Sequence, residues 1–251
     1  MSYFMEVPNS CFRENSGRMV VSIDQLTIKQ PCFTPCGLSH ALNWMYSVKV
    51  TIPYIEITDA LAAAHALALS SMVNAVEEKL ISMAEHPYTA LISLEHACFN
   101  ATTSTKEKII EIAVNHLSVF YTLPSFSAIL PVSFITLIKA AVNKIGDGVD
   151  AANVVRALIG WTTENHGEMK IVLSLLDLIP FRVFTLSDVT RLSKYAESEQ
   201  LVDLAKAFAH RYKGQIRDDR TVSRCLFMDE PEPSLAADYE EFANMSVLTT
   251  F

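Results

Sequence analysis

A chain of 251 residues is long enough to bury a sizeable hydrophobic core without disulfide or metal staples. Half of its residues are hydrophobic and only 19% are charged, which excludes a mostly disordered chain. Its seven glycines form no Gly-rich loop, which argues against all-β architectures and phosphate-cradling folds. We therefore expect a mainly helical protein.

The net charge of −8 is unevenly distributed along the chain. Residues 226–251 hold six carboxylates and no Lys or Arg, which leaves about −2 for the rest. The rest of the chain is therefore nearly neutral and has no stripe of Lys and Arg residues that would attract nucleic acid or an anionic membrane, so we expect neither partner. The five cysteines contain no two close pairs and predict reduced thiols in a cytoplasmic or nuclear protein.

The longest stretch without a charged side chain, residues 112–138, is long enough to span a bilayer. It contains Pro124 and Pro131, which break helices, together with several Ser and Thr residues. We therefore interpret it as two core helices and a turn, not as a membrane span.

Strand patterns are confined to the N-terminal fifth of the chain. Residues 18–24 form a β-branched run, and residues 49–53 alternate apolar and polar side chains. Between them, residues 37–46 carry apolar side chains at helical spacing. The order expected here is strand, helix, strand.

From residue 56 onward the hydrophobic period is that of helices. Ser70 and Ser71 are candidate caps of the second helix and Thr105 of the fourth, whereas either Asp150 or Asn153 could cap the helix that contains Trp161. The helices expected in chain order cover residues 60–69, 72–83, 87–100, 106–123, 132–142, 154–167, 169–179, 184–195 and 198–212. Beyond Lys213 we expect an acidic, weakly ordered tail with a short helix around residues 239–245.

These segments, in this order, resemble a BTB (POZ) domain followed by a BACK domain, as in adaptors of cullin-RING ubiquitin ligases. The resemblance lies in CFRENSGRMVVSID at 11–24, LNWMYSVKVTI at 42–52 and the Ala-rich run 60–81. It is most specific in residues 154–189, through the spacing of Trp161 and Pro180. Trp161 is expected to be structural, packed with Leu158 and Leu175.

The resemblance implies a mainly α fold: a truncated BTB domain of short strands and helices, then an all-helical BACK-like array of antiparallel helix pairs. The expected parts are a partial BTB domain (1–85), a three-box linker with the BACK domain (86–212) and the acidic tail (213–251). The family's dimerising helix and first hairpin would precede this chain's start, and no kelch repeat is recognisable. A homodimer would therefore be weakened.

The resemblance also implies a surface that faces the cullin. Phe12 and Glu14 match the family's hydrophobic-X-Glu element in a loop, and Trp44 and Tyr46 lie on the neighbouring helix. Trp and Tyr are typical interface anchors. An equal alternative is that Phe12 covers the small sheet and Glu14 is solvated. Leu42 and Met45 are expected in the core, with Trp44 exposed, and the helices from Pro87 to Asn143 would extend the surface.

Groups that could carry chemistry are few. Cys32, Cys36 and His40 form a possible ligand cluster, but no second close pair exists, and Pro35 and Gly37 should break the helix that would align them. We therefore expect no metal and no cofactor. His65 and His116 lie on apolar faces and are expected to be core histidines. His96 and Cys98 are two residues apart on a helix and cannot share a proton directly.

The expected function is thus a non-enzymatic adaptor that, by resemblance, brings proteins to a cullin-three RING ubiquitin ligase by proximity. One alternative is a cullin-independent scaffold or competitor that acts through its BACK helices or acidic tail. A helical enzyme is disfavoured because no acid/base pair, nucleophile triad or phosphate loop is discernible.

Overall fold

The computed structural model describes residues 12–15, 18–21, 33–46 and 50–226, and the side chains of residues 33–46 and 50–214. The chain divides into two compact units, Met1–Ala209 and His210–Phe251, which are described separately. The expected boundary after residue 85 falls inside the first unit. The acidic tail beyond Leu226 lies outside the described residues.

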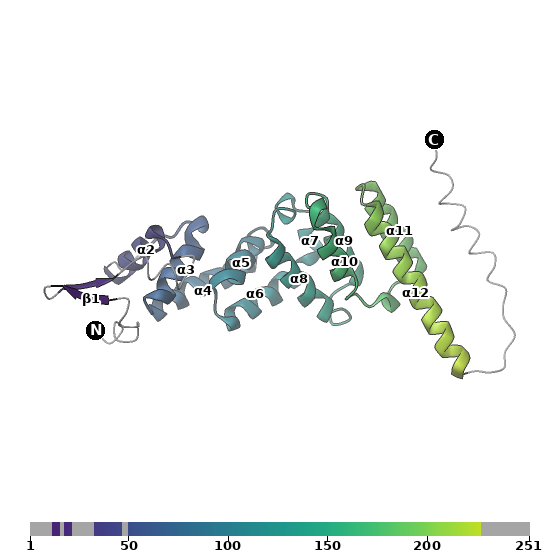
Figure 1. Cartoon of the computed structure of the whole chain (residues 1–251), viewed down its shortest axis with the longest axis horizontal. Helices are drawn as coiled ribbons and strands as arrows, with labels where there is room; N and C mark the ends of the chain where they lie inside the picture. Colours follow the sequence, from purple (N-terminus) through teal and green to yellow (C-terminus); the bar gives the residue numbers. More distant parts are fainter. Residues whose placement is uncertain (1–11, 16–17, 22–32, 47–49, 227–251) are drawn as a thin grey trace. The chain divides into compact units, whose positions relative to one another are not determined.

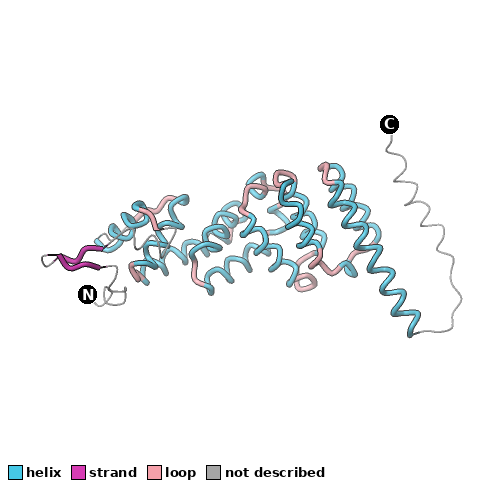
Figure 2. The backbone as a smooth tube through the Cα atoms, in the orientation of Figure 1, coloured by secondary structure: helices cyan, strands magenta, loops and turns pink. Residues whose placement is uncertain are grey.

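The described residues are mainly helical, which confirms the expected class (Figure 2). The α-helices are α2 (Pro35–Tyr46), α3 (Ile57–Ala66), α4 (Ser70–Ala84), α5 (Pro87–Asn100), α6 (Thr103–Asn115), α7 (Leu117–Phe120), α8 (Pro131–Asn143), α9 (Ala151–Thr162), α10 (Met169–Leu176), α11 (Leu186–Ser198) and α12 (Val202–Leu226). Short 3₁₀ helices are η3 (Tyr54–Glu56), η4 (Pro124–Phe126), η5 (His166–Glu168) and η6 (Phe181–Val183). Among the described residues, no helix is sufficiently long and apolar to cross a membrane.

An antiparallel hairpin precedes the helices. Strand β1 (Phe12–Asn15) pairs with β2 (Arg18–Val21), with Phe12 opposite Val21. The strand expected at 18–24 is therefore present over 18–21, and Phe12 to Glu14 lie in a strand where the resemblance implied a loop. The second expected strand is wrong over residues 50–53, which form neither strand nor helix. Residues 22–24 and 49 are outside the described part.

Most helices of the first unit pack against the helices next to them in the chain (Figure 1), whereas α7 and α11 contact α9. Helix α3 contacts α2, α4 and α5, and residues 60–64 of α3 are completely buried. Four of these five residues are alanines, whose small side chains let helices approach closely. Burial on several sides accounts for much of the chain's high apolar content.

The carboxylate of Glu77, a buried residue of α4, lies at the N-terminus of α6. Its Oε1 accepts a hydrogen bond from the backbone N–H of Thr102, at 2.6 Å. Its Oε2 accepts from the hydroxyls of Thr102 and Thr105, at 2.9 and 2.7 Å. These charge-assisted bonds satisfy an otherwise orphaned donor at the start of α6, where a negative charge also complements the helix dipole.

The second half of the first unit is built around Trp161 of α9, which is fully buried. Its ring stacks on Phe134 of α8 with centroids 4.1 Å apart, and its Nε1–H donates to the carbonyl of Ile129 at 3.1 Å. Phe126 and Phe120 continue this row of rings. The expected structural role of Trp161 is confirmed, with Leu158 and Leu175 also buried.

Helix ends follow the expected signals in part. Gly146 and Gly148 have φ of 94° and 97°, a left-handed conformation that glycine adopts without strain, and Asp150 caps α9 by accepting from Ala152 N–H. Of the two candidate caps, Asp150 is thus the one used. Ser70 and Ser71 are not caps, since they lie in the first turn of α4 after Leu69.

Helix boundaries differ most from the expected ones in two places. The run 106–123 is not one helix, because α6 ends at Asn115 and a separate turn, α7, begins at Leu117. The residue that precedes α6 is Thr102, not Thr105. Thr105 lies within the helix, and its hydroxyl donates a hydrogen bond to Glu77. At the other end, α12 continues to Leu226, so the helical region does not end near Tyr212.

Replacing Glu77 with Ala should destabilise the protein by about 2–4 kcal/mol, because one N–H and two hydroxyls lose a charged acceptor inside the protein. Glu77→Gln, which retains one acceptor oxygen, should cost less. Urea denaturation of the variants and of the matched control Glu78→Ala, an exposed neighbour on α4, measures this. Equal stabilities for Glu77→Ala and Glu78→Ala would contradict the assigned role.

Candidate functional site

The expected partner-facing residues fall into two groups. The side chains of Phe12 and Glu14 lie outside the described part, although their backbones form β1. Tyr46, the last residue of α2, is 85% exposed. Trp44 is only half-buried and donates from Nε1 to the Ser71 hydroxyl on α4 at 3.2 Å. The structure therefore holds Trp44 against α4, where the sequence suggested an exposed side chain.

The expected assignment of Leu42 and Met45 to the core is wrong. Both are exposed, at 43% and 44%, whereas Gly37 and Ala41 are the buried residues of α2. The physical reason is that α2 contacts α3 through its smallest side chains. The larger apolar residues are then turned outward.

Beside Trp44 lies an open groove with a volume of about 600 Å³. It is lined by the end of α2, the segment after it, η3 and α4, with Trp44, Ile52, Tyr54, Val76 and Met83 as apolar members. Two exposed residues of η3 adjoin this region, Tyr54 at 53% and Ile55 at 86%. The surface around η3 thus combines a hollow with large apolar side chains. Sequence reasoning missed the η3 residues because they lie in a short connection without a periodic pattern.

A compact cluster lies where α2 meets η3. His40 Nε2 is 2.5 Å from Glu56 Oε2 and 3.8 Å from Cys36 Sγ. Cys36 and His40 are four residues apart on one face of α2. The sequence interpretation that Pro35 and Gly37 break this helix is wrong, because Pro35 occupies its first position, where a missing N–H costs nothing. Cys32 lies outside the described residues.

The cluster's electrostatics follow from its contacts. The hydrogen bond from His40 is the main cause that lowers the pKa of Glu56, with a smaller contribution from the Cys36 thiol. The same carboxylate raises the pKa of Cys36, mainly through its hydrogen bond with the thiol. A raised pKa makes Cys36 a poor candidate for a nucleophile, since the thiolate is the reactive form.

Close packing of α2 on α3 sets the position of this cluster. A Cβ atom at Gly37 would lie 2.2 Å from the Asp59 carbonyl oxygen, so only glycine fits there. Thr34 ties the same two segments together, because its hydroxyl donates to Asp59 at 3.0 Å and accepts from Gly37 N–H at 3.1 Å. The side chains beside Gly37 are therefore held toward η3.

Two further histidines connect α3 to α5. His96 Nδ1 lies 2.6 Å from the Thr58 hydroxyl, and His65 Nε2 lies 3.0 Å from the carbonyl of Asn100. Asn100 in turn donates to the Thr58 carbonyl at 3.1 Å. Burial lowers the pKa of His96, against smaller opposing effects of Glu95, the Tyr54 backbone and Asp59. Neither His65 nor His116 is a fully buried core histidine, because both are only half-buried. His65 has a structural hydrogen bond, whereas His116 Nε2 has no hydrogen-bond partner among the described residues.

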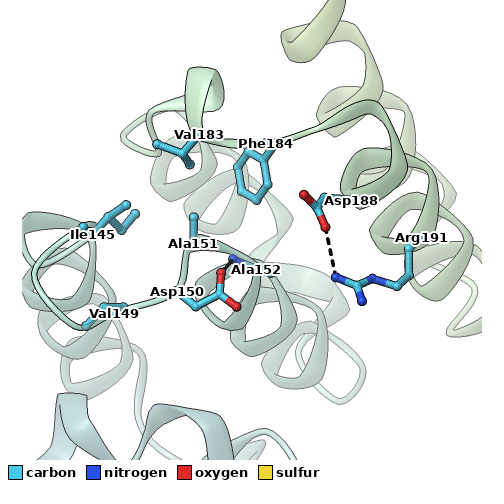
Figure 3. Close-up of a pocket in the computed structure, with 10 residues that line it drawn as sticks. Ile145, Val149, Asp150, Ala151, Ala152, Val183, Phe184, Asp188 and Arg191 are labelled. Atoms are coloured by element: carbon cyan, nitrogen blue, oxygen red, sulfur yellow. Dashed lines mark hydrogen bonds and ion pairs between the residues drawn. The ribbon is translucent and has the colours of Figure 1, made fainter.

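A second hollow, of about 250 Å³, lies between the Gly146 to Ala152 segment and the start of α11 (Figure 3). Its charged groups already have partners: Asp150 caps α9, and Asp188 pairs with Arg191 at 3.1 Å. Asp188 also completes a capping box with Thr185, whose hydroxyl hydrogen bond is the main cause that lowers the pKa of this carboxylate. These groups fix helix ends, and the hollow presents no pair suited to acid/base chemistry.

Substitution of Gly37 with Ala should destabilise the protein by about 1–3 kcal/mol, because the added methyl forces α2 away from the Asp59 backbone. Gly167→Ala is the matched control, since its Cβ would meet nothing within 4 Å. Thermal and urea unfolding of the two variants test this. A Gly37→Ala protein as stable as the control would show that α2 and α3 are not in close contact.

Stability should fall as the pH is lowered, partly through His96. Its pKa is lower in the folded protein than in the unfolded chain, where it is about 6.5, so its contribution is present above that pH and lost below it. Between about pH 7 and pH 5, the free energy of unfolding of His96→Gln should depend less on pH than that of the wild type. The exposed His166→Gln serves as the control. Identical pH profiles for wild type and His96→Gln would refute the assignment.

Comparisons with protein-family models, with curated proteins and with solved structures found no match to this chain.

Proposed function

We propose that this chain is a protein–protein interaction adaptor of the BTB–BACK type, which recruits a partner to a cullin-three RING ubiquitin ligase and catalyses nothing itself. The assignment to the family rests on the sequence resemblance. The location of the binding surface rests on the exposed residues around α2 and η3.

The observation that carries the proposal is the exposure of Tyr46, Tyr54 and Ile55, two of them above 80%. Large apolar side chains that remain in water cost free energy, and contiguous exposed apolar surface is typical of binding sites. Tyr is also among the residues most enriched at interface hot spots. The groove lined by Trp44 and Tyr54 would accept an apolar side chain of the partner.

The remaining features are consistent with an interaction module. The helices are packed in series and held by buried polar contacts such as those of Glu77 and Trp161. In the part of the chain that the structure describes, His65 and His96 form hydrogen bonds that hold α3 to α5, and His40 belongs to the Cys36 cluster. A function based on binding agrees better with this arrangement than acid/base catalysis.

In the proposal, Phe12, Glu14, Trp44 and Tyr46 face the cullin, and α5, which bears the exposed Tyr88, extends the surface. A second copy of this chain is the competing occupant, because the same apolar side chains could pair in a homodimer. A partner other than a cullin would use the same residues as part of a cullin-independent scaffold.

Calorimetric titration of the full chain with the N-terminal domain of cullin-three tests the proposal. Tyr46→Ala should weaken binding about tenfold or more, as expected for an anchor. Leu178→Ala, which removes another exposed apolar side chain (48% exposed) but one located after α10, should not. No measurable binding by the wild type would end the cullin proposal. Equal affinities of the two variants would show that the binding surface does not include Tyr46. Light scattering on the same samples distinguishes a homodimer from a monomer.

A further inference from the structure

We propose that Cys36, His40 and Glu56 form a binding site for a zinc ion at the junction of α2 and η3. This inference does not depend on the proposed adaptor function. It rests on three potential ligands of different chemistry that converge from two elements of the fold.

The geometry of the three ligand atoms fits one small cation. They all lie within 4.8 Å of one another, with His40 Nε2 3.8 Å from Cys36 Sγ and 2.5 Å from Glu56 Oε2. Ligands of one tetrahedral zinc ion lie about 3.3–3.6 Å apart, given bond lengths of about 2.0–2.3 Å. Binding therefore needs the imidazole and the carboxylate to separate by less than about 1 Å, and the thiol and the carboxylate, which are at most 4.8 Å apart, to lie about 3.6 Å apart. Side-chain rotation can supply both movements.

The protein backbone already brings these ligands together. The i, i+4 spacing of Cys36 and His40 aligns them on α2, in the same way that two helical histidines bind zinc in other proteins. The close contact of Gly37 with Asp59 and the hydrogen bonds of Thr34 hold this face of α2 toward η3. The Asp59 carboxylate, which acts electrostatically on Cys36, adds negative charge next to the site.

The ligand types indicate which metal would bind. A thiolate and an imidazole suit zinc and other late first-row cations, whereas Mg²⁺ and Ca²⁺ prefer sites made of oxygen ligands only. With three protein ligands, a fourth position is left for water, which the solvent exposure of Cys36 permits. Glu56 disfavours the free thiolate by raising the pKa of Cys36, but the charge of a bound cation reverses this effect. Zinc would therefore bind the thiolate form of Cys36, and the thiol proton is released to solvent as the metal–sulfur bond forms.

Zinc at this site would connect α2, which ends at the exposed Tyr46, to η3, which bears Tyr54 and Ile55. It would therefore stabilise the folded chain by binding the native state alone.

Titration of Zn²⁺ into the full untagged chain, reduced and freed of metal by a chelator, tests the proposal. The wild type should bind one ion, with a raised melting temperature. Cys36→Ser and Glu56→Gln should each weaken binding by about 100-fold or more, since even substitutions outside the ligand set cost 10–100-fold. Their matched controls are Cys98→Ser and Glu111→Gln, a cysteine and a carboxylate elsewhere in the fold, which should bind as the wild type does.

Cobalt substitution gives a readout that folding alone would not change. The Co²⁺-loaded wild type should show a sulfur-to-metal charge-transfer band that is absent from Cys36→Ser and retained by Cys98→Ser. A wild type that binds no zinc, equal affinities of Cys36→Ser and Cys98→Ser, or equally effective competition by Mg²⁺ would each overturn the proposal.

Discussion

The arrangement of the N-terminal helices depends on one constraint. The Ala-rich helix α3 is buried by close contact with three other helices, α2, α4 and α5. Its alanines leave little side-chain volume, so α2, α4 and α5 can approach its backbone directly. Dense packing then excludes water from the polar groups of α3, and these must find partners inside the protein. The hydrogen bonds of Thr58 and Asn100 are consequences of that burial.

The same close approach determines what α2 presents to solvent. Because Gly37 and Ala41 face α3, the larger residues Leu42, Met45 and Tyr46 are directed outward. It also places Cys36 and His40 against Glu56 of η3. One packing contact thus underlies both the exposed apolar residues of α2 and the mixed Cys, His and Glu cluster.

Polar contacts between neighbouring helices provide the specificity that apolar burial lacks. Apolar packing tolerates many helix arrangements, whereas a buried group such as Glu77 is satisfied only when the N-terminus of α6 lies against it. The indole N–H of Trp161 constrains α9 in a similar way, because its acceptor is the single carbonyl of Ile129. Such contacts are spread through the first unit.

Much of the helix order was predictable, because long apolar stripes, Pro87, the glycines near residue 147 and a capping residue at Asp150 or Asn153 are local signals. Which face of α2 is exposed could not be predicted. The sequence of α2 is compatible both with burial of its large apolar residues and with burial of its small residues. The partner of Glu77 was also hidden, because a charged residue on a helix is usually solvated. The Cys36 cluster needed Glu56, whose proximity to His40 is a property of the fold.

The sequence by itself therefore determined the helical class, the order of most helices and many of the places where the chain turns, although it missed the break between α6 and α7. It did so because propensity, hydrophobic period and capping act over a few residues. Only the tertiary structure decided which side of α2 is exposed, that Trp44 bonds to Ser71, and that Cys36, His40 and Glu56 meet. Those outcomes depend on contacts between separate elements, and a close contact such as that of Gly37 with Asp59 has no local signature.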